Sequence, residues 1–195
     1  MMRLTGLLTA TVLLAPPLMA HQPVLPDAGQ SFTRAAPYVV EDPETSKAIF
    51  ATLTGAPHYY QISSPVAFDF YVGITAPRME GCRLPQTFSF ELLDENFNRV
   101  DRRDGTRYTW QPWYEEFGRK WYWRGPEIGE NFQSDRRARA GTFYLRVFNA
   151  SNTGQYVLAV GDDEKFPPAV IARSLRIMPS INQTFWNEED CIPES

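Results

Sequence analysis

The chain has 195 residues, a formal net charge of −4, 14% aromatic residues and only two cysteines. This mildly acidic balance argues against nucleic-acid binding, which requires a basic face, and it gives no reason to expect attraction to anionic lipid. The length suits a short leader followed by one domain with a substantial core.

Residues 1–20 have the layout of a secretory signal peptide. One early cation, Arg3, precedes an apolar core from Leu4 to Leu14, and Ala20 supplies a small residue at the expected cleavage site. The apolar core is shorter than the ~20 residues that a membrane span needs, and no later run is longer. The sequence therefore predicts a secreted or periplasmic protein with no membrane span, whose mature chain begins at His21.

A proline-rich extended arm, residues 21–45, is expected to precede a series of short strands. These strands are predicted at residues 48–53, 58–62, 66–75, 87–93, 97–100, 141–148 and 155–160, separated by clusters of turn-forming residues. In residues 66–75, every second side chain is apolar and is expected to face a core: Val66, Phe68, Phe70, Val72 and Ile74. Helical periodicity is almost absent. The pattern predicts an all-β fold, an antiparallel β-sandwich or jelly roll, over residues 46–165.

Residues 166–195 are predicted to form a short C-terminal tail. Pro167 and Pro168 can open a helical turn, and Pro179 is expected to stop it. Cys82 and Cys191 are predicted to form a disulfide in an oxidising compartment, which would attach the tail to the body. Two unrelated thiols are the alternative.

The strand sequences resemble a known family. Residues 58–62 form a Tyr-Tyr strand, residues 88–96 form an alternating strand with a polar turn, and residues 140–147 and 154–160 form a final hairpin. The final hairpin is similar to that of the pre-peptidase C-terminal domain, a secreted bacterial β-sandwich often attached to exported peptidases and other hydrolases. The resemblance covers about residues 46–162, without an accompanying peptidase domain. It implies the sandwich fold and a non-catalytic binding or accessory role, and it implies no catalytic residues.

An aromatic insertion, residues 104–139, departs from that family and is expected to be a loop. Four of the five tryptophans lie within residues 110–123 of it. Flat indole faces can stack on sugar rings or hold a peptide, and a nearby cation can orient the ligand. The candidate ligand-binding residues are Trp110, Trp113, Trp121, Trp123 and Arg124. The alternative is structural, because a long loop stays ordered only if its rings are buried.

The two histidines of the chain suggest a second hypothesis. Cleavage after Ala20 would give His21 a free amino group beside its imidazole, and His58 could add a third nitrogen. Three nitrogen donors in this arrangement suit copper(II). The alternatives are that His21 is a terminal residue without a ligand and that His58 lies on the surface.

The sequence thus favours an exported, non-catalytic β-sandwich that binds a protein or a carbohydrate and needs no cofactor. No G-x-S-x-G or CxxC motif is present to indicate an enzyme. The alternative is a periplasmic copper-binding or redox protein using His21 and His58, with a copper-dependent oxidative enzyme as its catalytic form.

Overall fold

The computed structural model describes residues 21–193 except 117, 188 and 190. The predicted signal peptide, residues 1–20, lies outside the described residues. Within the described part, no helix is both long and apolar enough to cross a membrane.

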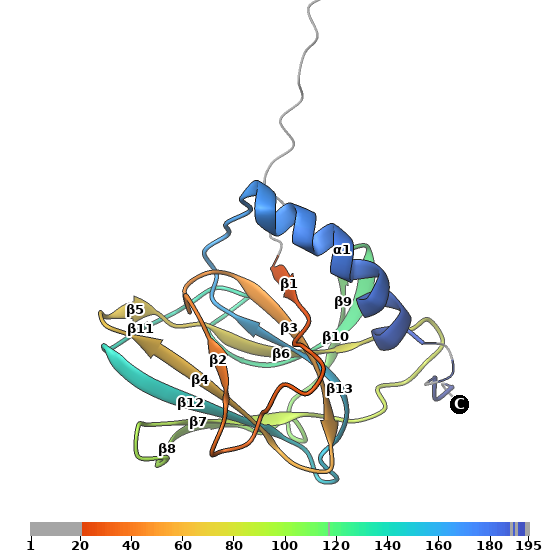
Figure 1. The fold of residues 1–195 in the computed structure, drawn as a ribbon. Coiled ribbons are helices and arrows are strands. Elements are labelled where there is room, and N and C mark those ends of the chain that lie inside the picture. Colours follow the sequence, from red (N-terminus) through yellow and green to blue (C-terminus); the bar gives the residue numbers. More distant parts are fainter. Residues whose placement is uncertain (1–20, 117, 188, 190, 194–195) are drawn as a thin grey trace, which may run out of the picture.

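Two β-sheets packed face to face form the body of the protein (Figure 1). One sheet has six strands in the order β1 (Gln22–Val24), β3 (Lys47–Thr54), β13 (Thr153–Val160), β6 (Val72–Pro77), β10 (Lys120–Ile128) and β9 (Gln111–Glu115). The other has five, in the order β2 (Tyr38–Val40), β4 (His58–Ser64), β12 (Gly141–Phe148), β7 (Ser89–Leu93) and β8 (Arg99–Arg103). A small ribbon pairs β5 (Phe68–Asp69) with β11 (Arg137–Ala138). The all-β sandwich predicted from the strand pattern is confirmed.

The main core lies between the two sheets. Leu145 and Val147 of β12 face Ile49 of β3 and Leu158 of β13 across this core, and all four side chains are fully buried. The predicted core positions of residues 66–75 are also correct, except that Val66 is 62% exposed. That segment is not one strand but divides into β5 and β6, which join different sheets.

The N-terminal arm contributes an edge strand to each sheet. Its strand β1 pairs in parallel with β3, and β2 pairs in parallel with β4. Short edge strands of this kind cover backbone groups that would otherwise be open to pairing with another chain.

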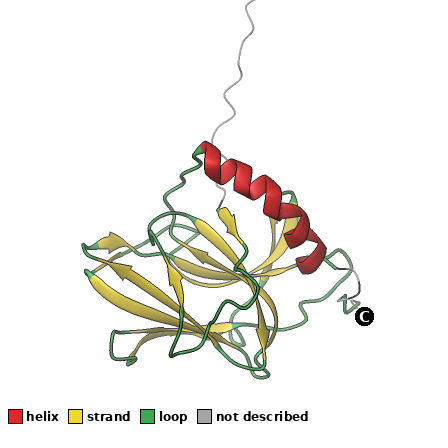
Figure 2. Cartoon of the chain, in the orientation of Figure 1, coloured by secondary structure: helices red, strands yellow, loops and turns green. Residues whose placement is uncertain are grey.

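The expected stop at Pro179 is wrong. The helix α1 runs from Pro168 to Phe185, with Pro179 inside it (Figure 2). Proline lacks the N–H that would bond one turn back, which weakens a helix at that point. The chain nevertheless stays helical because the turn after the proline places Ile181 and Phe185 against the sheet, where both side chains are buried.

Helix α1 covers the outer face of the six-stranded sheet (Figure 1). Phe185 lies edge-on to Phe50 of β3, with ring centroids 5.0 Å apart. Tyr122 of β10 and Val157 of β13 belong to the same cluster. This sheet is therefore apolar on both faces, and the helix is the layer that buries the second face.

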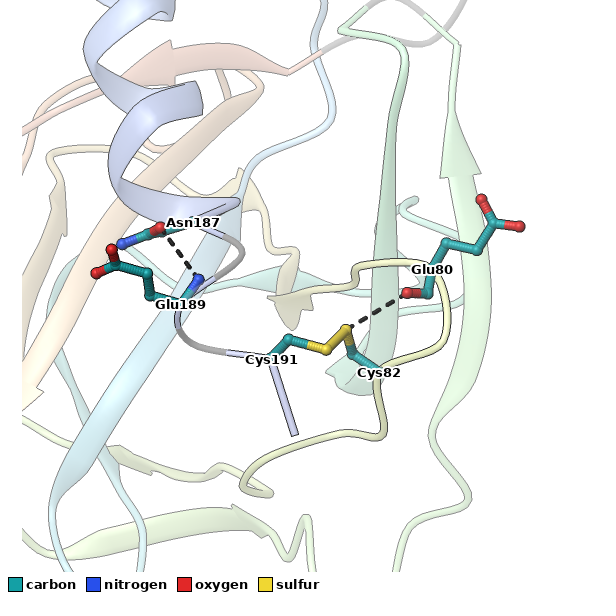
Figure 3. The surroundings of a disulfide bond; sticks show 5 residues. All are labelled: Glu80, Cys82, Asn187, Glu189 and Cys191. Atoms are coloured by element: carbon teal, nitrogen blue, oxygen red, sulfur yellow. Dashed lines mark hydrogen bonds between the residues drawn. A yellow bond between two sulfur atoms is a disulfide. The ribbon is translucent and has the colours of Figure 1, made fainter. Parts of the chain in front are cut away.

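The predicted disulfide is confirmed. It joins Cys82, in the loop after β6, to Cys191, with 5.4 Å between the two Cα atoms (Figure 3). The backbone N–H of Arg83 also donates to the carbonyl of Ile192 at 2.9 Å. The segment that follows α1 is thus attached to the body by one covalent bond and by backbone pairing.

Candidate functional site

The aromatic insertion forms a β-hairpin at the edge of the six-stranded sheet. Strands β9 and β10 pair in antiparallel register, with Trp121 opposite Tyr114 and Tyr122 opposite Trp113. Directly paired residues share a face of the sheet, so the rings divide between two faces. The expectation of a loop is therefore corrected, because about half of residues 104–139 belong to strands.

One face of this hairpin turns toward helix α1. Trp113 packs against Phe132, with ring centroids 4.5 Å apart, and against Tyr122 at 5.7 Å. The Arg124 guanidinium lies 4.8 Å from the centre of the Phe132 ring and is paired with Glu127 and Asn131. On this face the rings pack on one another and the guanidinium is paired through both of its terminal nitrogens, while its Nε is buried without a hydrogen-bond partner among the described residues.

The opposite face carries Tyr114, Trp121 and Trp123. The Tyr114 and Trp121 rings lie 5.1 Å apart and remain 40% and 44% exposed. The guanidinium of Arg78, from the segment after β6, lies 5.3 Å from the Trp121 ring and 5.1 Å from the Trp123 ring. We call Tyr114, Trp121, Trp123 and Arg78 the aromatic platform.

Two polar groups within the platform are unpaired. The Trp123 Nε1 and Arg78 Nε atoms are buried and have no hydrogen-bond partner among the described residues. A buried donor left unpaired costs about 1–3 kcal/mol, so each would gain from an acceptor supplied by a ligand or by water.

Trp110 lies on the same face of the hairpin as the platform, beyond Trp123, where it packs on the core. Its ring packs on Phe88, and its Nε1 donates to the carbonyl of Gly105 at 2.9 Å. A side chain at Gly125 would overlap the Trp110 ring, so the glycine allows β10 to approach it. Of the predicted ligand-binding residues, only Trp121 is exposed; the structure places Trp123 beside it, partly buried against the core.

The two histidines lie on different sides of the six-stranded sheet. The His21 ring packs on the outer side, 5.7 Å from Phe132 and 6.3 Å from Tyr71. The His58 ring lies on the inner side, stacked 4.2 Å from Phe32, with its Nδ1 2.8 Å from the Tyr156 hydroxyl. The structure does not bring the two imidazoles to one point. Among the described residues, no three His, Cys, Asp or Glu side chains gather as metal ligands would.

Burial sets the protonation of both histidines. Loss of solvent lowers the pKa of His58 from 6.5 to about 4. The same cause lowers the pKa of His21 to about 4, against the opposing charge of Asp162. Both imidazoles are therefore neutral at pH 7. His58 continues into a buried polar chain, because the Tyr156 and Tyr60 hydroxyl oxygens lie 2.6 Å apart.

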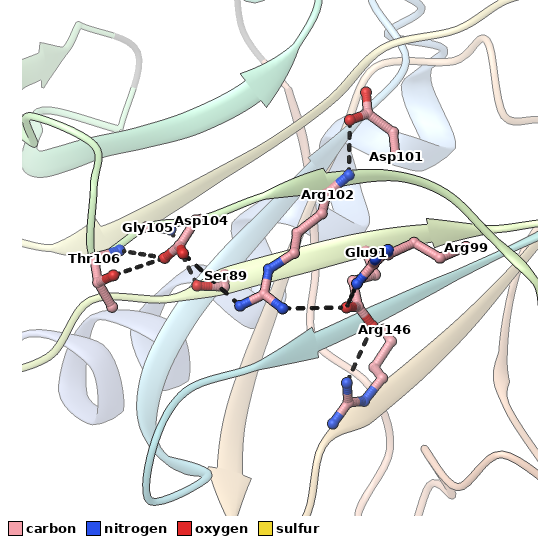
Figure 4. Close-up of polar contacts among 9 residues, drawn as sticks. All are labelled: Ser89, Glu91, Arg99, Asp101, Arg102, Asp104, Gly105, Thr106 and Arg146. Carbon is pink, nitrogen blue, oxygen red and sulfur yellow. Dashed lines mark hydrogen bonds and ion pairs between the residues drawn. The ribbon is translucent and has the colours of Figure 1, made fainter.

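A charged cluster on the outer face of the five-stranded sheet was not predicted from the sequence (Figure 4). The Glu91 carboxylate is buried and lies 3.0 Å from Arg146, 3.5 Å from Arg99 and 3.6 Å from Arg102. Arg146 and Arg102 are the residues directly opposite Glu91 on the neighbouring strands. Opposite charges at such positions stabilise strand pairing, and the cluster holds the edge strand β8 in place. The signal in the sequence was an acidic residue alternating with the core residues Phe90 and Leu92.

Comparisons with known proteins return similar solved structures only, since no family model and no curated protein matches the chain. The pre-peptidase C-terminal domain of a collagenase from Bacillus anthracis is 14% identical, with a TM-score of 0.32. That match covers 60% of this chain and 87% of the collagenase domain. The family suggested by the strand sequences is thus among the structures that the chain is similar to.

The catalytic domain of a GH87 alpha-1,3-glucanase is also similar, in structures with tetrasaccharides and with nigerose. The two are 13% and 12% identical to this chain, each with a TM-score of 0.29. Each match covers 61% of this chain but only 23% of the glucanase chain.

Proposed function

We propose that this protein is an exported, non-catalytic binding module that holds a saccharide on its aromatic platform. The observation that carries the proposal is the exposed pair of Tyr114 and Trp121, backed by Arg78. Aromatic faces stack on the apolar face of a sugar ring, while the guanidinium offers N–H donors to hydroxyl oxygens. This combination suits holding a ligand rather than transferring a proton.

The size of the platform favours a saccharide over a protein. Tyr114 and Trp121 expose about two fifths of their surface, which amounts to roughly 150–200 Å² for two rings of this kind. A stable protein interface takes about 800 Å² from each partner. Two half-exposed rings therefore match one or two sugar units better than a protein surface.

Two features support export of the module. The Cys82–Cys191 disulfide is typical of an oxidising compartment. The first twenty residues have the layout of a signal peptide. A module of this kind would serve an accessory role, bringing itself or a partner to a polysaccharide.

Retention on immobilised polysaccharides tests the proposal. The wild-type protein is passed over a panel of insoluble glucans, cellulose, chitin and peptidoglycan, and we expect delayed elution on at least one. Trp121→Ala and Tyr114→Ala should each remove that delay and leave the circular dichroism spectrum unchanged. Tyr108→Ala is the matched control, because Tyr108 is also an exposed ring, 39% exposed, but lies outside the platform.

Three results would contradict the proposal. One is elution without delay on every polysaccharide, and another is retention that survives both platform substitutions. The third is binding to a protein alone, which would assign the platform to a protein partner.

A further inference from the structure

A cavity of about 330 Å³ lies between helix α1 and the outer face of the six-stranded sheet. Its floor includes Ala48 of β3 and Ala159 of β13, which are directly paired. Two residues further along the same face, the pair is Phe50 and Val157. Because paired residues share a face, two small side chains beside two larger ones leave a hollow under the helix.

The walls of the cavity are mainly apolar. Trp113, Tyr122 and Phe132 line it from the sheet side, and Leu175 and Met178 line it from α1. Leu175 is 73% exposed, which is unusual for a leucine beside an otherwise packed helix face. The protein itself therefore leaves apolar surface uncovered at the rim of the cavity.

Two polar atoms of the lining are buried without a partner. They are His21 Nε2 and Asn182 Oδ1, and neither has a hydrogen bond among the described residues. Each unpaired group costs about 1–3 kcal/mol when buried. A neutral imidazole nitrogen donates or accepts according to its tautomer, and the amide oxygen accepts. The apolar cavity thus has two sites where a ligand hydroxyl or amine could bond.

Two carboxylates at or near the cavity disfavour an anion, and in the processed chain the α-amino group of His21 would offset only one of them. Glu115 lines the cavity, with a carboxylate oxygen that accepts from the backbone N–H of Gly118. Asp162 lies close enough to His21 to act on it electrostatically. A negatively charged ligand would face these carboxylates, and the ring walls would not replace its hydration.

We propose that this cavity is a second binding site, which takes a small neutral molecule that is mostly apolar and carries one or two hydrogen-bonding groups. Its volume falls at the lower end of the range for ligand pockets, ~300–1,000 Å³, which fits a molecule of about two or three six-membered rings. The site lies on the opposite face of the β9–β10 hairpin from the aromatic platform and does not depend on saccharide binding.

The probe N-phenyl-1-naphthylamine tests this proposal, because it is neutral, has three six-membered rings of which two are fused, and carries a single N–H. Titrated into the full exported protein, it should gain fluorescence with a dissociation constant of about 1–10 µM. Excitation of tryptophan should transfer energy to it, since Trp113 lines the cavity. No gain in fluorescence up to about 100 µM would overturn the proposal.

Substitutions in the floor locate the bound probe. Ala159→Leu fills the cavity and should weaken binding at least about tenfold. Ala172→Leu makes the same change on the exposed side of α1 and should leave binding unchanged. Where Ala159→Leu disturbs the circular dichroism spectrum, Ala48→Leu at the partly exposed end of the floor replaces it. Undiminished binding in the folded floor variant would place the probe elsewhere and refute the site.

Replacing a polar residue of the lining tests whether hydrogen bonding adds to the apolar contacts of the bound probe. Asn182→Leu keeps the cavity apolar but removes the unpaired acceptor, and binding should weaken about three- to tenfold. Unchanged or tighter binding would contradict the hydrogen-bonding part of the proposal. Trp121→Ala should leave the affinity for the probe unchanged. The proposals for this cavity and for the saccharide platform are therefore tested separately.

Discussion

The two faces of the six-stranded sheet are buried in different ways. The inner face packs on a second sheet, where Leu145, Val147 and Leu158 are completely buried. The outer face packs on a single helix, which covers Phe50 and Val157 but leaves a cavity beside them. A second sheet offers a matching pleated surface along its whole length, whereas one helix offers only a narrow apolar stripe.

This difference suggests where function can lie in the protein. A closed inner core tolerates neither voids nor unpaired polar groups, and it serves stability. The outer face and its edge hairpin contain the cavity, the exposed rings and the unpaired polar atoms of Arg78, His21 and Asn182. We expect changes in the core between the sheets to affect folding, and changes at the outer cavity or on the exposed rings of the edge hairpin to affect binding.

The largest expected effect on stability comes from removing the disulfide that attaches the segment after α1 to the body of the protein. Replacing Cys82 and Cys191 together with serine opens a loop of 109 residues, for which the chain-entropy model gives about 4–5 kcal/mol. The free energy of unfolding in urea should fall by an amount of this order, with the fold retained at low temperature. A loss below about 1 kcal/mol would mean that α1 docks independently of the disulfide.

Two leucine-to-alanine substitutions compare how much a side chain on each face contributes to stability. Leu158→Ala, in the inner core, should cost about 2–5 kcal/mol because it removes a buried side chain and leaves a cavity. Leu175→Ala, at the rim of the outer cavity, should change stability by less than about 0.5 kcal/mol. Chemical denaturation of both variants provides the measurement, and similar losses would remove the distinction between the faces.

Lowering the pH should reduce the stability of the folded protein through His58, which is buried on the inner side of the six-stranded sheet. Its pKa is 6.5 in an unfolded chain and about 4 in the folded protein, so the unfolded state takes up the proton first as the pH falls. The contribution of His58 to stability is therefore fully present above pH 6.5 and is lost toward pH 4, by about 1–2 kcal/mol because the ring keeps part of its solvation.

Urea unfolding at several pH values measures this decline. His58→Phe should flatten the profile between pH 6.5 and 4, and the part that remains comes from His21, whose pKa is lowered in the same direction. A variant profile as steep as that of the wild type would contradict the role given to His58.

The sequence predicted the inner core well because its signal is local. The strands predicted at residues 141–148 and 155–160 form the final hairpin, and four of the five core positions predicted in residues 66–75 are buried. The disulfide was also predictable, since an exported chain with two cysteines has one possible intramolecular pairing.

The outer face was less predictable because it depends on contacts between distant residues. Strands β9 and β10 have aromatic side chains on both faces, so Trp121 and Tyr122 show no alternation of apolar and polar residues. Pro179 suggested the end of a helix, and only the sheet surface under Ile181 and Phe185 explains why it continues. The cavity results from the pairing of Ala48 with Ala159, which no local pattern reveals.

Assigned indole N–H signals in an NMR titration would test the central claim most directly. The five tryptophans give five such signals, and soluble oligosaccharides of glucose and of N-acetylglucosamine are the ligands. The account predicts that the Trp121 signal shifts first, accompanied by that of Trp123, while the signals of Trp110, which packs on the core, and of Trp113, at the cavity, stay in place. No shift at Trp121 with any of these sugars, or shifts confined to Trp113, would contradict a saccharide site on the aromatic platform.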